Sequence, residues 1–369
     1  MIRCSGIFLL FALMASSLMA GPAKVQYRHK SIQVPPAGSD EPIRETFSLE
    51  AATDYLLNGS LAWVRARDCV SCHTPGAYMQ VMPELTPVAG RPADEMRTFF
   101  VEQLARLKTL PRERFEKGTR TGQAIYIAAG LAEWDRHVEA GRRSEDTEEA
   151  LKFVFDLQGD SGTWQSLDCW PPFESSAWQQ AIVVARAATS APGWLKEKAE
   201  SDPALAEGVA GLKTYLKTTP PPHDYGRVLL LRAATGMPRL IDEKTKQDIL
   251  ARIWTRQRND GGWSIRDFAA PEAWGRGNRA KKLRAEPDFA DPPSDGHMTG
   301  LAVLALREAG VPATDERIQR AVQWLLTHQR GSGRWWTRSL NTDDYHFITY
   351  SGTAYPLLAL ARCGALGAD

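Results

Sequence analysis

The stretch QRNDGGW, residues 257–263, has the pattern Gln, three residues, Gly, one residue, Trp. The same pattern occurs as QGDSGTW at 158–164 and as QRGSGRW at 329–335. Each copy follows a stretch whose apolar residues recur every three or four positions, as they do on one face of a helix. These stretches are TEEALKFVFDL, TKQDILARIWTR and DERIQRAVQWLLTH. The motif therefore predicts a turn at the end of an amphipathic helix.

Each motif is followed by a segment that is apolar almost all round. AWQQAIVVARAA, TGLAVLALREAG and SGTAYPLLALARCG are rich in Ala and Leu, and a helix of this composition is buried. Degenerate copies of the pair lie at 49–85, 93–134 and 207–236, with Pro83 interrupting the second helix of the first. We expect six hairpins, each made of an outer amphipathic and an inner buried helix. Six such hairpins can bury their inner faces by closing into a ring.

These repeats resemble the terpenoid-cyclase and protein-prenyltransferase superfamily, which includes squalene-hopene cyclases. The resemblance covers about residues 45–365 and implies an all-α fold, the α6/α6 toroid. We therefore expect a toroid domain at 45–369, preceded by an extended N-terminal segment at 21–44. It also implies that the Gln and Trp side chains tie neighbouring helices together and take no part in chemistry. The sequence has no D-x-D-D run for protonating a polyene and no D-D-x-x-D run for diphosphate-bound magnesium. Protonation-type cyclisation is therefore disfavoured.

Residues 1–20 have the layout of a cleaved signal peptide. An early Arg3 is followed by an apolar run over 7–14 and then by small residues leading to Ala20. We expect export to the periplasm or the cell surface, and a mature chain without a membrane-spanning segment, because no second long apolar run follows. The 45 basic and 44 acidic residues nearly balance, so a nucleic-acid partner is not expected.

The stretch RARDCVSCHTPGAYM at 65–79 places Cys69, Cys72 and His73 in a C-x-x-C-H motif. Two cysteines at this spacing can form thioethers to the two haem vinyl groups, and the adjacent histidine then faces the iron as proximal ligand. A redox dithiol would need a βαβ setting, and a structural zinc site would need a second close pair of ligands; neither is found in the sequence. The motif predicts covalent haem c. Another metal, a disulfide or no ligand at all are the alternatives.

A second candidate site follows from a resemblance to the prenyltransferase branch, whose zinc ligands lie in D-x-C and D-x-Y-H patterns. SDGHMTG and DDYHF match them in part: Asp295 is at the carboxylate position, His346 at the histidine, and His297 where the family has cysteine. An Asp-His-His set suits zinc or iron with one open position. The Cys-to-His change does not fit the activation of a thiol on zinc. The alternative is that both histidines are ordinary helix-start residues bonded to turn carbonyls.

The topology predicts that these residues share one rim. In every hairpin the turn after the outer helix lies at the same end of the ring, and five potential ligands lie in or next to such turns: His73, Cys169, His223, His297 and His346. Because the first and last hairpins meet when the ring closes, the haem at His73 is expected to approach His346. The candidates for a sixth haem ligand are His297, His346, Met79 and Met82, or the position is vacant.

We therefore expect an exported c-type haem protein that transfers electrons or oxidises a bulky apolar ligand held in the ring. Its partners would be a redox protein or an isoprenoid-like small molecule. If the protein is an enzyme, an oxidoreductase is favoured over a cyclase or prenyltransferase. Two alternatives stay open: a metal-dependent isoprenoid-binding or prenyltransferase-like enzyme with zinc or iron at Asp295, His297 and His346, and a helical scaffold without catalytic activity.

Overall fold

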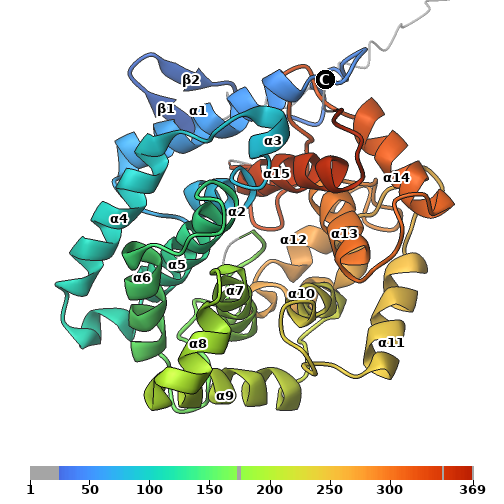
Figure 1. Cartoon of the computed structure of the whole chain (residues 1–369). Helices are drawn as coiled ribbons and strands as arrows, with labels where there is room; N and C mark the ends of the chain where they lie inside the picture. Colours follow the sequence, from blue (N-terminus) through green and yellow to red (C-terminus); the bar gives the residue numbers. More distant parts are fainter. Residues whose placement is uncertain (1–24, 173–175, 343–344, 368–369) are drawn as a thin grey trace, which may run out of the picture.

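The computed structural model describes residues 25–172, 176–342 and 345–367, so the predicted signal peptide at 1–20 lies outside the described residues. Figure 1 shows a ring of helices in which an outer set surrounds an inner set. The outer set consists of α1 (Leu49–Arg67), α4 (Asp94–Lys108), α6 (Glu145–Asp156), α9 (Pro203–Thr218), α11 (Glu243–Trp254) and α14 (Glu316–Thr327). The inner set consists of α2 (Pro75–Val81), α5 (Arg120–His137), α7 (Ala177–Ser190), α10 (Asp224–Ala234), α13 (Gly296–Glu308) and α15 (Phe347–Arg362).

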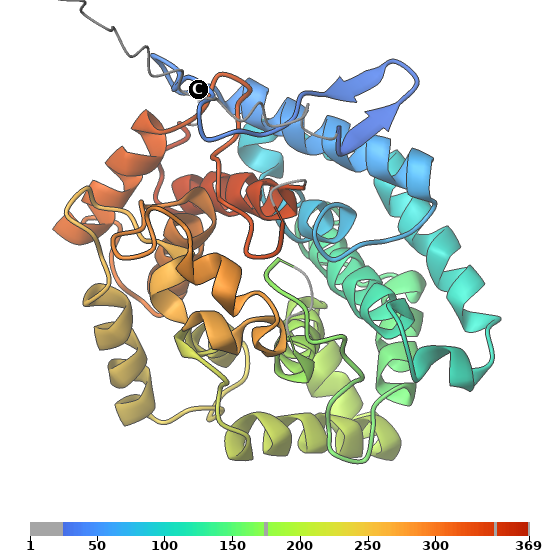
Figure 2. The ribbon, with the colours of Figure 1, turned by 180° about the vertical axis from the view of Figure 1, so that it is seen from behind.

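Outer and inner helices alternate along the chain, and each pair is one of the six hairpins that the repeats predict. The outer helix α14 buries a stripe that includes Ile318, Val322 and Leu325, whereas the inner helix α13 is buried at every position from Gly296 to Leu306. Seen from behind, the inner helices again lie within the outer ones (Figure 2). The fold is an α6/α6 toroid, as the sequence predicts.

Short elements connect or cover the hairpins. They are α3 (Thr86–Ala89), α8 (Trp194–Ser201), α12 (Ala280–Arg284), the 3-10 helices η1 (Arg112–Phe115), η2 (Ile265–Phe268), η3 (Pro271–Ala273) and η4 (Gly275–Gly277), and the strands β1 (Tyr27–His29) and β2 (Ile32–Val34). Of the helices in the described part of the chain, none is both long enough and apolar enough to cross a membrane.

The tryptophans of the three motifs close the ends of three outer helices. Trp164, Trp263 and Trp335 are buried, and each indole N–H donates to the carbonyl oxygen ten residues earlier, at 2.7, 2.7 and 2.8 Å. These carbonyls lie in the last turn of α6, α11 and α14, where regular helical hydrogen bonds end. The Val154 and Ile253 carbonyls also accept from the backbone N–H three residues on, at 3.1 and 3.2 Å. The indole therefore caps one helix while filling the space behind it.

The glutamines of the motifs link each hairpin to the next one. Each side-chain amide nitrogen donates to the carbonyl of its own motif glycine, at 2.8–2.9 Å, and to a carbonyl near the start of the next outer helix, at 2.8–3.0 Å. The second acceptors are Gly208 in α9, Arg317 in α14 and Ser48 before α1. The contact between Gln329 and Ser48 joins the sixth hairpin to the first, so the motif also closes the ring.

Both the backbone conformation and the packing require the glycine of the motif. Gly162, Gly261 and Gly333 all have a left-handed backbone, with φ of 82°, 94° and 89°. A Cβ at each position would also collide with the backbone of the next outer helix, at Gly211, Arg320 and Ala51 respectively. Within seven residues, the motif therefore provides a turn, a glycine that lets the next outer helix approach closely, and an indole that caps the preceding helix.

The N-terminal segment predicted to be extended at 21–44 contains an antiparallel hairpin in its described part, with Tyr27 opposite Val34. The Tyr27 ring packs edge-on against Tyr55 of α1 and Tyr350 of α15, with centroids 6.4 and 5.8 Å away. The hairpin thus covers the seam where the first and last hairpins meet.

Candidate functional site

The predicted rim residues lie where the inner helices begin. His73 precedes α2, Cys169 lies in the turn that leads to α7, and His223, Asp295 and His346 are the residues directly before α10, α13 and α15. His297 is the second residue of α13. We call this end of the ring the mouth. The structure therefore gathers these residues at one end, although their side chains differ in what they contact.

The C-x-x-C-H stretch forms the turn between α1 and α2. The outer helix ends at Asp68, which has a left-handed backbone with φ of 47°, and the chain then turns inward toward Pro75. Cys69 and Cys72 are half-buried thiols, not joined in a disulfide. Burial raises the pKa of the Cys69 thiol. This turn takes the place that a Gln-Trp turn has in hairpins three, five and six.

His73 is buried at the mouth and held in a fixed orientation. Its Nδ1 is 2.8 Å from the Thr74 hydroxyl, which is in turn 3.1 Å from the hydroxyl of Tyr27 in β1. The ring lies between Trp63, edge-on at 4.6 Å, and Phe347, tilted at 4.1 Å. Burial lowers the pKa of His73 to about 3. The imidazole is therefore neutral at physiological pH, which is the form that ligates a metal.

Phe347 directly follows His346, so the predicted approach of the first and last hairpins does occur at His73. The His346 ring lies 6.2 Å from the ring of Trp336, and its backbone N–H donates to the side chain of Gln26. Asp343 and Asp344, which belong to the same predicted pattern, lie outside the described residues. Ligation of a haem iron by His346 stays a prediction.

Asp295 acts as the N-cap of α13. One carboxylate oxygen accepts from the Met298 N–H at 2.8 Å and the other from the Ile265 N–H at 2.7 Å. The Thr337 hydroxyl lies 3.3 Å from the first oxygen. Burial raises the pKa of Asp295 to about 6. The carboxylate is thus occupied in fastening the turn after Trp263 to an inner helix.

His297 is fully buried, with both ring nitrogens engaged. Nε2 is 3.1 Å from the Tyr225 hydroxyl and Nδ1 is 2.8 Å from the Ser351 hydroxyl, which donates to the Ile348 carbonyl at 3.1 Å. Because the serine hydroxyl donates onward, the imidazole carries its proton on Nδ1, and Tyr225 donates to Nε2. Tyr225 lies 72 residues away in sequence, and no pattern in the sequence signals this pair.

The structure does not assemble the predicted Asp-His-His metal site. Among the described residues, the group of three side chains that places its ligand atoms within 4.8 Å of one another lies elsewhere and does not include Asp295, His297 or His346. The physical reason is that Asp295 caps a helix and His297 is hydrogen-bonded on both sides. His223 is likewise a cap, because its Nδ1 accepts from the Gly226 N–H at 2.9 Å. His297 is therefore a hydrogen-bonded helix-start residue, as the alternative reading expects, although its partners are the Tyr225 and Ser351 hydroxyls rather than turn carbonyls.

The buried His297 gives a testable pH dependence. Burial lowers the pKa of His297 to about 3. At pH values below about 6.5, the ordinary pKa of histidine, this side chain is therefore protonated in the unfolded chain but stays neutral in the folded chain. His297 should therefore reduce the stability at pH 5 by about 2 kcal/mol relative to pH 7. Denaturant titrations of the wild type and of His297→Gln at both pH values check this. We expect a smaller loss in the variant, and equal losses would contradict the assignment.

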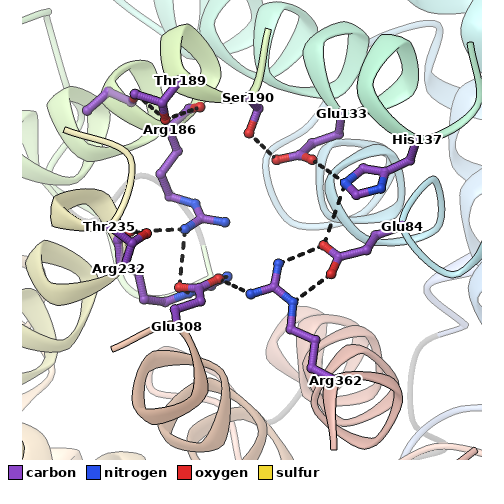
Figure 3. Close-up of polar contacts among 11 residues, drawn as sticks. Glu84, Glu133, His137, Arg186, Thr189, Ser190, Arg232, Thr235, Glu308 and Arg362 are labelled. Carbon is purple, nitrogen blue, oxygen red and sulfur yellow. Dashed lines mark hydrogen bonds and ion pairs between the residues drawn. The ribbon is translucent and has the colours of Figure 1, made fainter. Parts of the chain in front are cut away.

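The opposite end of the ring, where the inner helices finish, carries a second set of polar side chains that the sequence analysis missed (Figure 3). We call these residues the basal network: Glu84, Glu133, His137, Arg186, Ser190, Arg232, Glu308 and Arg362. Every inner helix contributes at least one of them, counting Glu84 as the continuation of α2. A signal was present in the sequence, because charged residues lie near the end of each apolar inner segment.

Glu308 is the centre of the basal network. Its side chain is 7% exposed and accepts two hydrogen bonds from Arg232 at 2.8 Å, one from Arg362 at 2.5 Å and one from Arg186 at 3.4 Å. These three guanidinium groups hold the pKa of the Glu308 carboxyl far below its usual range, despite its burial. The carboxylate is therefore charged at neutral pH.

No family model and no curated protein matches the chain, but several solved structures do. The ent-copalyl diphosphate synthase from Streptomyces platensis matches with a TM-score of 0.48 and 15% identity, over 79% of this chain and 50% of that one. The type II terpene cyclase MstE from Scytonema matches with a TM-score of 0.45 and 15% identity, over 85% and 97%. A glycosidase variant matches with a TM-score of 0.50 and 10% identity, over 86% and 98%.

The likeness is one of fold. At 10–15% identity, the matches give no information about function. This chain spans half the length of the copalyl diphosphate synthase that it matches. The three proteins are named as a diphosphate synthase, a type II terpene cyclase and a glycosidase. Because unrelated activities use one fold, the function has to be argued from the side chains at the mouth.

Proposed function

We propose that this protein is an exported c-type haem protein whose haem is carried at the mouth of the ring. Cys69 and Cys72 would hold the haem through thioethers, and His73 would be its proximal ligand. The haem supplies one-electron chemistry when bound. The observation that carries the proposal is the placement of the complete C-x-x-C-H motif in the turn between α1 and α2, at the mouth of a helical ring.

The residues around His73 fit this role. A metal-ligating histidine normally has its other ring nitrogen hydrogen-bonded, which fixes both the tautomer and the direction of the ring. Thr74 provides that contact at Nδ1, and Tyr27 holds the Thr74 hydroxyl from the far side. Trp63 and Phe347 pack against the ring and keep it from rotating. The protein thus prepares one neutral imidazole in one orientation, next to two thiols.

The position at the mouth supports two uses of the haem. A haem there can exchange electrons with a redox partner, or it can oxidise a bulky apolar ligand bound by the ring. Trp63, Trp170, Phe347 and Tyr355 are partly buried aromatic side chains of the mouth and inner ring, and such side chains suit an apolar, isoprenoid-like ligand. Export fits both uses, since covalent haem attachment takes place outside the cytoplasm.

A double substitution tests the attachment. Cys69→Ala with Cys72→Ala, expressed beside the haem-maturation machinery, should carry no covalent haem while keeping its helical circular dichroism, because the core is built by the other hairpins. The matched control is Cys363→Ala, which removes a half-buried thiol after α15 and should retain the haem. Denaturing gels stained for haem give the readout. Equal staining of wild type and double variant, or none in either, would overturn the proposal.

Binding of an apolar isoprenoid without haem is the second candidate function, and the same partly buried aromatic side chains favour it. Geranylgeraniol added to the double variant should quench tryptophan fluorescence saturably, and Phe347→Ala with Tyr355→Ala should weaken this quenching. Linear, unsaturable quenching in both proteins would exclude the candidate.

A further inference from the structure

The basal network contains three metal-binding side chains whose ligand atoms converge. They are Glu84, which follows α2, and Glu133 and His137, which lie four residues apart on one face of α5 (Figure 3). One oxygen of each carboxylate and one ring nitrogen of the histidine all lie within 4.8 Å of one another. We propose that these three side chains bind one divalent transition-metal ion, at the end of the ring opposite the mouth.

The distances fit coordination better than hydrogen bonding. His137 Nε2 lies 3.4 Å from Glu133 Oε2 and 3.8 Å from Glu84 Oε2. Charge-assisted N–H···O bonds are shorter, at about 2.7–2.9 Å. Ligand atoms about 2.0–2.2 Å from a tetrahedral metal lie ~3.3–3.6 Å from each other. The two separations from Nε2 match the edges of such a tetrahedron to within a few tenths of an ångström, and the two carboxylate oxygens lie within 4.8 Å of each other.

Neighbouring side chains hold the two carboxylates in place. The Ser190 hydroxyl donates to Glu133 Oε1 at 2.6 Å, which leaves Oε2 directed at His137. Arg362 donates to both oxygens of Glu84 at 2.6 and 2.7 Å. Such outer contacts are typical of metal ligands, since they fix the direction of the lone pairs. The three ligands therefore do not have to be reorganised when the ion binds.

The charged side chains at this end do not oppose the binding of a cation. Three carboxylates of the basal network (Glu84, Glu133 and Glu308) face three guanidinium groups, so these six charges cancel. All inner helices also end here, and a helix C-terminus carries partial negative charge. His137 is itself the last residue of α5. A bound cation would therefore be attracted by the helix dipoles and would not be repelled by a net excess of arginine side chains.

The ligand chemistry narrows the choice of ion. Two carboxylates and one imidazole suit Zn²⁺, Mn²⁺ or Fe²⁺, with an open position for water. Glu84, Glu133 and Ser190 come from the first three hairpins, and Arg362 from the sixth, so an ion here would join four hairpins. This proposal does not depend on a haem at the mouth, because none of its residues belongs to the C-x-x-C-H turn.

Metal binding by the full chain tests the proposal. The Cys69→Ala, Cys72→Ala protein is used, so that the thiols cannot take up zinc, and it is stripped with a chelator before Mn²⁺ is added. The electron paramagnetic resonance signal of free Mn²⁺ should fall by one equivalent per chain. Zn²⁺ should compete for the site and raise the melting temperature. A protein that leaves both ions in solution would overturn the proposal.

Variants identify the ligands. In that background, His137→Ala and Glu133→Gln should each weaken binding by more than about 100-fold, because even loss of an outer partner costs about 10- to 100-fold. Glu133→Gln keeps an oxygen for Ser190 and so should preserve the fold. His29→Ala, in strand β1, is the control and should bind normally. Unchanged binding in both ligand variants would contradict the assignment of the site.

Discussion

Trp263→Ala should lower the free energy of unfolding by about 3–5 kcal/mol, the usual range for emptying a buried aromatic site. The indole is 0% exposed, and its N–H holds the Ile253 carbonyl at the end of α11 at 2.7 Å. The substitution leaves a cavity and removes one of the hydrogen bonds to that carbonyl, which still accepts from the Arg256 N–H at 3.2 Å. The expected loss of stability is that of a structural residue. Denaturant titration followed by circular dichroism measures the change.

A neighbouring tryptophan provides the control. Trp254 is only partly buried, with its ring stacked under the Arg317 guanidinium at 3.9 Å. Trp254→Ala should therefore cost less than Trp263→Ala, although both remove the same side chain from the same region. Equal losses would mean that burial and capping do not explain the motif. A change in a haem spectrum with little loss of stability would show that the motif has a role at the mouth.

Glu308→Gln should cost about 3–5 kcal/mol, because it leaves buried guanidinium groups without their counter-charge. Arg232 is the most affected, since its side chain is 7% exposed and both of its ion-pair contacts at 2.8 Å are to Glu308. Arg362 keeps its second partner, Glu84. Denaturant titration at pH 7 gives the value.

The matched control is an ion pair of the same geometry at the surface. Arg65 also donates two hydrogen bonds to Glu95, at 2.8 and 2.6 Å, but the two side chains are 40% and 46% exposed. Glu95→Gln should cost less than about 1 kcal/mol, as exposed pairs do. If both substitutions cost the same, burial is not what makes the basal network essential.

The fold could be predicted because its repeats are local in sequence. The motif at 257–263 contains a turn, a glycine that allows close approach and a capping indole within seven residues, and its three copies fix three hairpins. The helical spacing of apolar residues predicts the other three hairpins. The β-hairpin at the N-terminus was not anticipated, because its role depends on contacts between Tyr27 and residues of α1 and α15.

The side-chain chemistry was less predictable because it depends on contacts between distant residues. Asp295 and His297 have the residue types of metal ligands, yet backbone N–H groups and Tyr225 occupy them. The metal-binding geometry instead lies at the other end of the ring, with Glu84 about fifty residues from Glu133. Spacing within one helix indicates Glu133 and His137, but no pattern brings Glu84 to them. The C-x-x-C-H motif differs, since all its residues lie in one turn.

The pyridine haemochrome spectrum tests the central claim most directly. The mature protein, purified from an export- and maturation-competent host, is denatured in alkaline pyridine, reduced and scanned. We predict the absorption bands of a haem c, in a ratio of one haem per chain, and we expect them to be absent from the Cys69→Ala, Cys72→Ala protein. A folded protein from that host without these bands would contradict the assignment of a haem to the mouth of the ring.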